Sequence, residues 1–292
     1  MHILFACIEF QSLTGMPMYL YELSRRYVQL GHNVTIVAKA AGGEIAKRAI
    51  ENGVSVFTDD ISDDFMPTPD ILHLNEYEPS YNAILRWPDV PAVATVHSQY
   101  PCEQPFNHPN IKRYICIRPE IIDKIKRGDG IPASKIRFIP NGIDFDRFNT
   151  LNTELKQPKK LVVFAGTIDP LRKKSIVHLV DKSINEDFNL LLIGKKHDTY
   201  LDHGLPSNVE WMDSVWDIES YIKQADETAG ILLGRTTLES WRCGIPCWIY
   251  DVDLQGCIKS VKLHQPPKDI DKYNINNVAD RILALYKEVL SV

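Results

Sequence analysis

The feature that most constrains the fold is the alternation of short apolar segments with amphipathic segments. Residues 3–8 (ILFACI) form an uninterrupted apolar run, which is typical of strands buried on both faces of a sheet. Residues 16–30 then place apolar side chains three and four positions apart, which predicts a helix with one buried face. The next strand is expected at residues 33–40. Strand, helix and strand in this order form a βαβ unit, so these two strands are expected to be parallel.

The same alternation continues through the first half of the chain and starts again in the second half. In the first half, further strands are expected at 54–57, 70–74, 92–97, 114–117 and 135–139, and helices at 43–52 and 119–127. In the second half, strands are expected at 161–168, 189–194, 209–212, 229–234 and 246–251, and helices at 174–185, 216–225, 236–243 and 276–290.

The segment between the halves is rich in residues that favour turns, among them Pro140, Asn141 and Gly142. We therefore place a domain boundary near residue 149. The pattern predicts an α/β protein with two doubly wound, Rossmann-like domains, residues 1–148 and 149–292. Such domains bind ligands at the carboxyl ends of their strands, so the ligand site is expected in a cleft between the domains.

Composition excludes some functions. The net charge of −5 argues against a general nucleic-acid-binding protein, which is usually strongly basic. A basic stretch at residues 112–137 is a local exception. Such runs are most often solvated helix faces, but this one could also meet an anionic acceptor or a membrane surface. No apolar run reaches the roughly 18 residues that a membrane span needs, and the first residues lack the basic segment of a signal peptide. We expect a cytoplasmic protein, and no cysteine or histidine group has zinc-site spacing.

Five segments, in order, resemble the motifs of glycosyltransferase family 4, which has the GT-B fold. They are LTGMPMYLYELSRRYVQLGHNVTIV at 13–37, VATVH at 93–97, KIRFIPNGIDFDRF at 135–148, FAGTIDPLRKKS at 164–175 and ESWRCGIPCWIYD at 239–251. The sequence departs from the family at two positions. Thr167 replaces an arginine, and Ile231 replaces the first of two glutamates, of which Glu239 is the second.

The resemblance implies that the first domain is the acceptor side of the site. Gly15 stands between a strand and a helix N-terminus, where a glycine lets the backbone approach a diphosphate. His97 is expected beside the transferred sugar, donating a hydrogen bond to the developing phosphate anion, although a histidine there can also be purely structural. Asn75, Glu76 and Glu78 follow a strand and either orient an acceptor hydroxyl or are ordinary loop residues.

The resemblance also implies that the second domain binds the nucleotide-sugar. The expected donor-binding residues are Gly166, Thr167, Gly234, Arg235, Thr236, Thr237 and Glu239. Thr236 or Thr237 is a natural helix N-cap, and Glu239 would accept hydrogen bonds from the ribose hydroxyls. Arg172 or Lys173 would neutralise the leaving phosphate, and Arg235 could replace the guanidinium that Thr167 lacks.

The resemblance implies a retaining glycosyltransferase, and the absence of a paired-carboxylate metal motif indicates a metal-independent reaction with no cofactor beyond the co-substrate. The donor would be a UDP-, GDP- or ADP-sugar, and the acceptor hydroxyl could belong to a glycan, a lipid-linked group, a protein or a modified nucleic acid. Two alternatives stay open: a nucleotide-sugar epimerase of the same fold, and a catalytically degenerate protein that only binds the sugar nucleotide.

Overall fold

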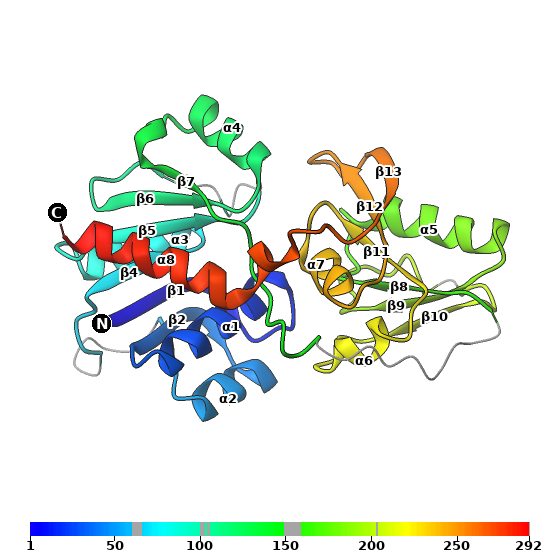
Figure 1. Cartoon of the computed structure of the whole chain (residues 1–292), viewed down its shortest axis with the longest axis horizontal. Helices are drawn as coiled ribbons and strands as arrows, with labels where there is room; N and C mark the ends of the chain where they lie inside the picture. Colours follow the sequence, from blue (N-terminus) through cyan, green and yellow to red (C-terminus); the bar gives the residue numbers. More distant parts are fainter. Residues whose placement is uncertain (60–65, 100–102, 104–105, 149–158, 203, 292) are drawn as a thin grey trace. The chain divides into compact units, whose positions relative to one another are not determined.

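The computed structural model describes residues 1–59, 66–99, 103, 106–148, 159–202 and 204–291. The chain forms two compact units (Figure 1). The first unit contains residues Met1–Gly142 and Lys272–Val292, and the second contains Ile143–Asp271.

The first unit is built on a seven-stranded parallel sheet with the order β3-β2-β1-β4-β5-β6-β7. Its strands are β1 (His2–Phe10), β2 (Asn33–Ala41), β3 (Ser55–Thr58), β4 (Ile71–Leu74), β5 (Ala92–Val96), β6 (Ile111–Cys116) and β7 (Ile136–Phe138). Its helices are α1 (Gly15–Gln29), α2 (Gly43–Glu51), α3 (Tyr77–Arg86), α4 (Pro119–Gly128) and α8 (Ile275–Leu290), with a 3-10 turn, η3 (Ala133–Lys135).

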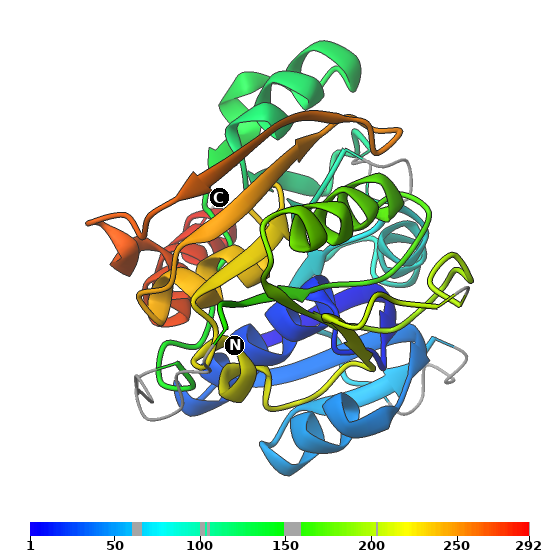
Figure 2. The same cartoon turned by 90° about the vertical axis from the view of Figure 1, so that its right-hand side faces the viewer.

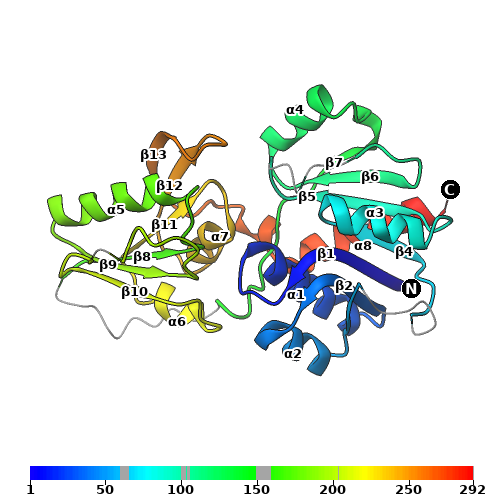
Figure 3. The ribbon, with the colours of Figure 1, turned by 180° about the vertical axis from the view of Figure 1, so that it is seen from behind.

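Helices cover both faces of this sheet. Figures 1 and 3, seen from opposite sides, show α8 on one face and α3 on the other. Successive residues of β1 point to opposite faces of the sheet, because side chains alternate along a strand. Phe5 lies against Tyr27 of α1 and His73 of β4. Leu4 belongs instead to the core beneath α3 and α4.

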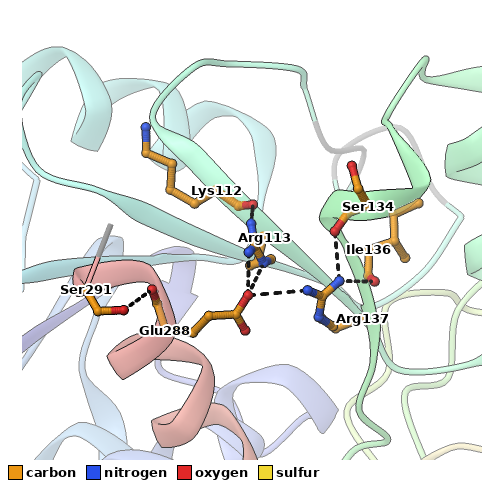
Figure 4. Close-up of polar contacts among 7 residues, drawn as sticks. All are labelled: Lys112, Arg113, Ser134, Ile136, Arg137, Glu288 and Ser291. Carbon is orange, nitrogen blue, oxygen red and sulfur yellow. Dashed lines mark hydrogen bonds and ion pairs between the residues drawn. The ribbon is translucent and has the colours of Figure 1, made fainter.

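Helix α8 follows the second unit in sequence but packs on the sheet of the first. Tyr286 of α8 hydrogen-bonds Nδ1 of the fully buried His73, whose Nε2 lies 2.7 Å from Oγ1 of Thr95. Near the end of α8, the Glu288 carboxylate accepts from Arg113, with Nε 3.0 Å away, and from a second arginine on β7 (Figure 4).

This packing changes the expected domain division. The predicted boundary near residue 149 lies outside the described residues, and residues 272–292 were assigned to the second domain. The structure instead divides the chain after Gly142 and returns the C-terminal helix to the first unit. The apolar face of α8, which includes Val278, Ile282 and Tyr286, is buried there.

The second unit has a six-stranded sheet with the order β10-β9-β8-β11-β12-β13. Its strands are β8 (Leu161–Ala165), β9 (Asn189–Ile193), β10 (Val209–Met212), β11 (Glu227–Ile231), β12 (Cys247–Val252) and β13 (Ile258–His264). Its helices are α5 (Lys173–Asn185), α6 (Ile218–Ile222) and α7 (Arg235–Arg242), and the 3-10 turn η4 (Ile270–Tyr273) spans the division between the units. All strand pairs are parallel except β12 and β13, the antiparallel pair seen in orange in Figure 2.

Two elements were not expected from the sequence. Helix α3 buries only a short set of small and apolar residues, and it exposes Tyr77, Tyr81 and Leu85, so the helical period is blurred. Strand β13 is an exposed edge strand with Lys259 and Lys262, a composition that protects sheet edges but weakens the strand signal.

The basic stretch at 112–137 is largely engaged within the first unit. Arg113 and Arg137 bind Glu288, Lys124 donates to the Gln99 carbonyl at 3.2 Å, and Lys135 donates to the Ile111 carbonyl at 3.0 Å. The stretch is therefore less available to an anionic partner than its composition indicates.

Candidate functional site

Most of the predicted site residues lie where the strand order of each sheet reverses. In the second unit, the chain runs from β8 to β9 on one side, and β11 pairs with β8 on the other. In the first unit, β1 is flanked by β2 and β4 in the same way. At such a point, the connections after the two neighbouring strands run to opposite sides of the sheet. In doubly wound folds this opens a crevice at the carboxyl ends of the two strands, where ligands bind.

The turn after β8 carries Gly166 and Thr167, and it approaches the turn after β9 very closely. A Cβ atom placed on Gly194 would lie 2.0 Å from the Gly166 carbonyl oxygen, so only glycine is accommodated there. Beyond this point the two loops are joined, because the Ile168 amide donates to the Lys195 carbonyl at 3.0 Å. Gly194 is a residue that the sequence analysis did not single out; its signal is a glycine directly after an apolar strand.

Helix α7 begins beside this turn. The hydroxyl of Thr236 donates to the Ala165 carbonyl at the end of β8, at 2.7 Å. The N-cap residue is Gly234, and among the described residues no side chain caps the first turn. The expectation that Thr236 or Thr237 caps α7 is therefore wrong, because the Thr236 hydroxyl binds β8 and that of Thr237 faces the Leu232 carbonyl at 3.4 Å. The first-turn amides of a helix have no partners within the helix, and the partial positive charge of a helix N-terminus favours anions.

Arg235 and Glu239 form an ion pair across one turn of α7. The Nε atom of Arg235 lies 2.6 Å from Oε1 of Glu239, and the two side chains are 12% and 5% exposed. The expectation that Arg235 serves the diphosphate in place of the arginine missing at Thr167 stays a prediction. The guanidinium is directed to the carboxylate of Glu239, which it neutralises and orients.

Arg172 and Lys173, the alternative phosphate ligands, are distinguished by their contacts. Arg172 precedes α5, and both its backbone amide and its guanidinium bind the carboxylate of Asp169. Lys173 is the first residue of α5, and its Nζ atom lies 5.1 Å from the centre of the Tyr200 ring. Tyr200, which sequence reasoning missed, therefore lies beside the candidate phosphate site.

In the first unit, Asn75 and Glu76 follow β4 at the reversal point. The Asn75 amide donates to the Ala6 carbonyl of β1 at 3.2 Å, and Glu76 accepts from the Ile8 amide of β1 at 2.5 Å. Burial raises the pKa of Glu76 to about 7, so its carboxyl group titrates near neutral pH. Glu78 points elsewhere, because it pairs with the exposed Lys39 at 2.8 Å.

His97 follows β5, next to Asn75. Its side chain is only 7% exposed, its Nε2 atom lies 3.1 Å from Oδ1 of Asn75, and its ring meets Tyr19 edge-on at 5.3 Å. Burial, together with the nearby Arg118, lowers the pKa of His97 to about 3, so the ring is neutral at physiological pH. A small cavity in the same unit is lined by Leu74, Asn75, Glu76, Tyr77, Thr95 and Phe106, among others, and His97 is not one of its lining residues.

Gly15 is the first residue of α1, whose N-cap residue is Thr14. A Cβ atom placed on Gly15 would meet no atom within 4 Å in the described part of the chain. The packing of the first unit therefore does not itself require glycine at this position, and the space beside it is open to a ligand.

Two searches for other features had negative results. Within the described ranges, no group of three or more His, Cys, Asp or Glu side chains is arranged to hold a metal ion. No helix in those ranges is both long and apolar enough to cross a membrane.

The chain was compared with known families and structures. Residues 13–147 match the model of Glycosyltransferase Family 4, whereas no curated protein sequence matches significantly. A glycosyltransferase from Rickettsia africae ESF-5 has a similar structure, with a TM-score of 0.73 and 14% identity over 99% of this chain and 98% of that chain.

Two further structures extend this similarity. Anabaena Alr3699/HepE in complex with UDP-glucose has a TM-score of 0.68 and 16% identity, over 99% of this chain and 92% of that chain. AviGT4, a glycosyltransferase involved in avilamycin A biosynthesis, has a TM-score of 0.66 and 12% identity, over 99% of this chain and 98% of that chain. The family model therefore matches residues 13–147, and the solved structures show that the whole chain has the GT-B fold of glycosyltransferases.

Proposed function

We propose that this glycosyltransferase moves a sugar from a nucleoside-diphosphate sugar to a hydroxyl acceptor, with retention of the anomeric configuration and without a divalent metal ion. The observation that carries the proposal is the arrangement at the strand-order reversal of the second unit. A glycine-containing turn after β8, the amino end of α7 and the cationic residues before and at the start of α5 follow one sheet edge.

This arrangement suits the chemistry of a sugar nucleotide. Breaking the anomeric C–O bond gives an oxocarbenium-like sugar and a diphosphate that gains negative charge. The backbone amides of α7 and the side chains of Arg172 and Lys173 would stabilise that anion. Glu239, held by Arg235, would accept hydrogen bonds from the ribose hydroxyls. These groups supply the positive potential themselves, which supports a reaction without Mg²⁺.

UDP-sugars are the first donors to test, because HepE, which has a similar fold, was crystallised with UDP-glucose and with UDP. The resemblance to family 4 supports retention, with the leaving phosphate helping to deprotonate the acceptor. In the first unit we assign Gly15 to the diphosphate, His97, beside Asn75, to the transferred sugar, and Glu76 to the acceptor. Glu76, with a pKa of about 7, is the acid suited to orient a hydroxyl. A cytoplasmic location stays a prediction.

The test is to incubate the protein with a panel of UDP-, GDP- and ADP-sugars and candidate acceptors, and to follow the reaction by NMR. Release of free nucleoside diphosphate together with a new glycoside of unchanged anomeric configuration is expected. Conversion of the donor sugar without an acceptor would identify an epimerase. Donor binding without turnover would identify a degenerate sugar-nucleotide-binding protein.

The metal requirement is measured in the same assay. Turnover is expected to persist in excess EDTA and to change little when Mg²⁺ or Mn²⁺ is added. Complete loss of turnover in EDTA, followed by recovery with either ion, would contradict the metal-independent mechanism and leave the transferase assignment intact.

A further inference from the structure

The hydrogen bonds of Asn75 fix the orientation of its side-chain amide. The Nδ2 group donates to two backbone carbonyls, those of Ala6 at 3.2 Å and His73 at 3.3 Å. The amide oxygen Oδ1 is therefore the atom that faces Nε2 of His97, at 3.1 Å. An amide oxygen only accepts hydrogen bonds, so Nε2 of His97 must carry a proton.

The surroundings of His97 keep its ring neutral. Tyr19 of α1 packs edge-on against the ring, and His73 of β4 is close enough to interact with it electrostatically. Arg118, which precedes α4, is the cation that disfavours a second positive charge at this position. A neutral ring with a proton on Nε2 has a lone pair on Nδ1. Within the described ranges, Nδ1 makes no hydrogen bond.

We infer that Asn75 is a positioning residue that fixes His97 as the Nε2–H tautomer, so that Nδ1 accepts a hydrogen bond from a hydroxyl group of the bound sugar. This role rests on the proposed function, because it needs a sugar in the site. It replaces the expectation that His97 donates to the phosphate. A lone pair repels a phosphate anion, whereas a sugar hydroxyl supplies the donor that Nδ1 requires.

The tautomer can be measured directly on the ligand-free protein. In a ¹⁵N-histidine-labelled sample, long-range ¹H–¹⁵N NMR spectra distinguish the two neutral tautomers from the imidazolium, and the spectrum of His97→Gln identifies the His97 signals. The neutral Nε2–H form is expected across pH 5 to 8. A neutral Nδ1–H form or a charged ring at pH 7 would overturn the inference, whether or not the protein turns over a donor.

Asn75→Asp tests the consequence for activity. A carboxylate beside Nε2 raises the pKa of His97, so the ring becomes an imidazolium that carries a proton on both nitrogens. Nδ1 then donates and cannot accept. We expect kcat/KM at pH 6 to fall by about 10-fold or more, because the buried Nδ1–H group would then face the hydroxyl group of the sugar without an acceptor between them. Activity is expected to recover as the pH rises through the new pKa of His97.

The matched control is Asn52→Asp, the same change at the exposed end of α2. It should leave both the pH profile and the His97 signals unchanged. A pH-independent loss in folded Asn75→Asp, with His97 still neutral, would show that Asn75 has only a structural role. Absence of turnover in the wild-type protein would overturn the proposed function alone, because the tautomer is measured without a substrate.

Discussion

At the scale of single residues, the ion pair of Arg235 and Glu239 is central to the proposed donor site. Both side chains are largely buried, and they lie one turn apart on the helix that begins beside β8. A buried carboxylate needs a partner charge, and its remaining lone pairs can then accept hydrogen bonds from a ligand. In the proposed site, Arg235 therefore balances the charge of the carboxylate that would bind the sugar hydroxyls.

Glu239→Gln is expected to weaken the binding of the free nucleoside diphosphate by about 1.5–3 kcal/mol, the usual value for a hydrogen bond to a charged group. Calorimetric titration with UDP, GDP and ADP measures the change. The substitution also leaves the Arg235 charge uncompensated, so circular dichroism must first confirm that the variant is folded.

Glu186→Gln is the matched control for this experiment. Glu186 is an exposed residue at the C-terminal end of α5, where it pairs with Lys182. Its substitution is expected to leave nucleotide affinity unchanged. If folded Glu239→Gln binds nucleotide as tightly as the wild type does, Glu239 does not belong to the nucleotide site.

At the scale of elements, α8 shows how a helix can be predicted correctly and still be assigned to the wrong domain. Its apolar residues recur with a helical period, and it was expected at residues 276–290. The periodicity specifies a buried face but not the sheet that covers it. That choice is made by contacts with residues far away in sequence, such as His73 and Arg113.

Two substitutions on α8 compare its buried and exposed contacts. Tyr286→Phe leaves the buried His73 without its hydroxyl partner, so the unfolding free energy is expected to fall by about 1–3 kcal/mol. Glu288→Ala removes contacts of a side chain that is 43% exposed, and a loss below about 1 kcal/mol is expected. Urea unfolding measures both. Equal losses would contradict the view that His73 anchors α8.

At the scale of the whole molecule, buried neutral histidines make stability depend on pH. Burial lowers the pKa of His73 and of His97 to about 3, from the ordinary value of 6.5. The unfolded chain therefore binds more protons between pH 6.5 and pH 3, and stability is lost as the pH falls through this range. Glu76 acts in the opposite direction, because its raised pKa favours the folded state as the pH falls below 7.

His73→Gln isolates one of these contributions. Each buried histidine is expected to cost about 2 kcal/mol of unfolding free energy between pH 7 and pH 5, a value set mainly by the pKa of the unfolded chain. Between pH 7 and pH 5, the unfolding free energy of the variant should therefore fall by about 2 kcal/mol less than that of the wild type. His264→Gln, at an exposed position of β13, should behave as the wild type does. If His73→Gln loses as much unfolding free energy between pH 7 and pH 5 as the wild type does, the proton linkage is contradicted.

Much of the fold was available from the sequence, because helical and strand periods are local properties. The first βαβ unit and the doubly wound class were both predicted from such patterns. Helix α3 and strand β13 were missed where exposed side chains interrupt the period.

The family motifs assign Gly166, Thr236 and Glu239 to one donor site, and in the structure the Thr236 hydroxyl donates to the Ala165 carbonyl at the end of β8. The roles of these residues stay predictions. The tertiary structure decided what no local pattern contains: which sheet receives α8, how closely Gly194 approaches Gly166, and which atom of Asn75 faces His97. Each depends on the order in which distant strands pair, and that order minimises the free energy of the assembled sheet and its covering helices, which no single segment can specify.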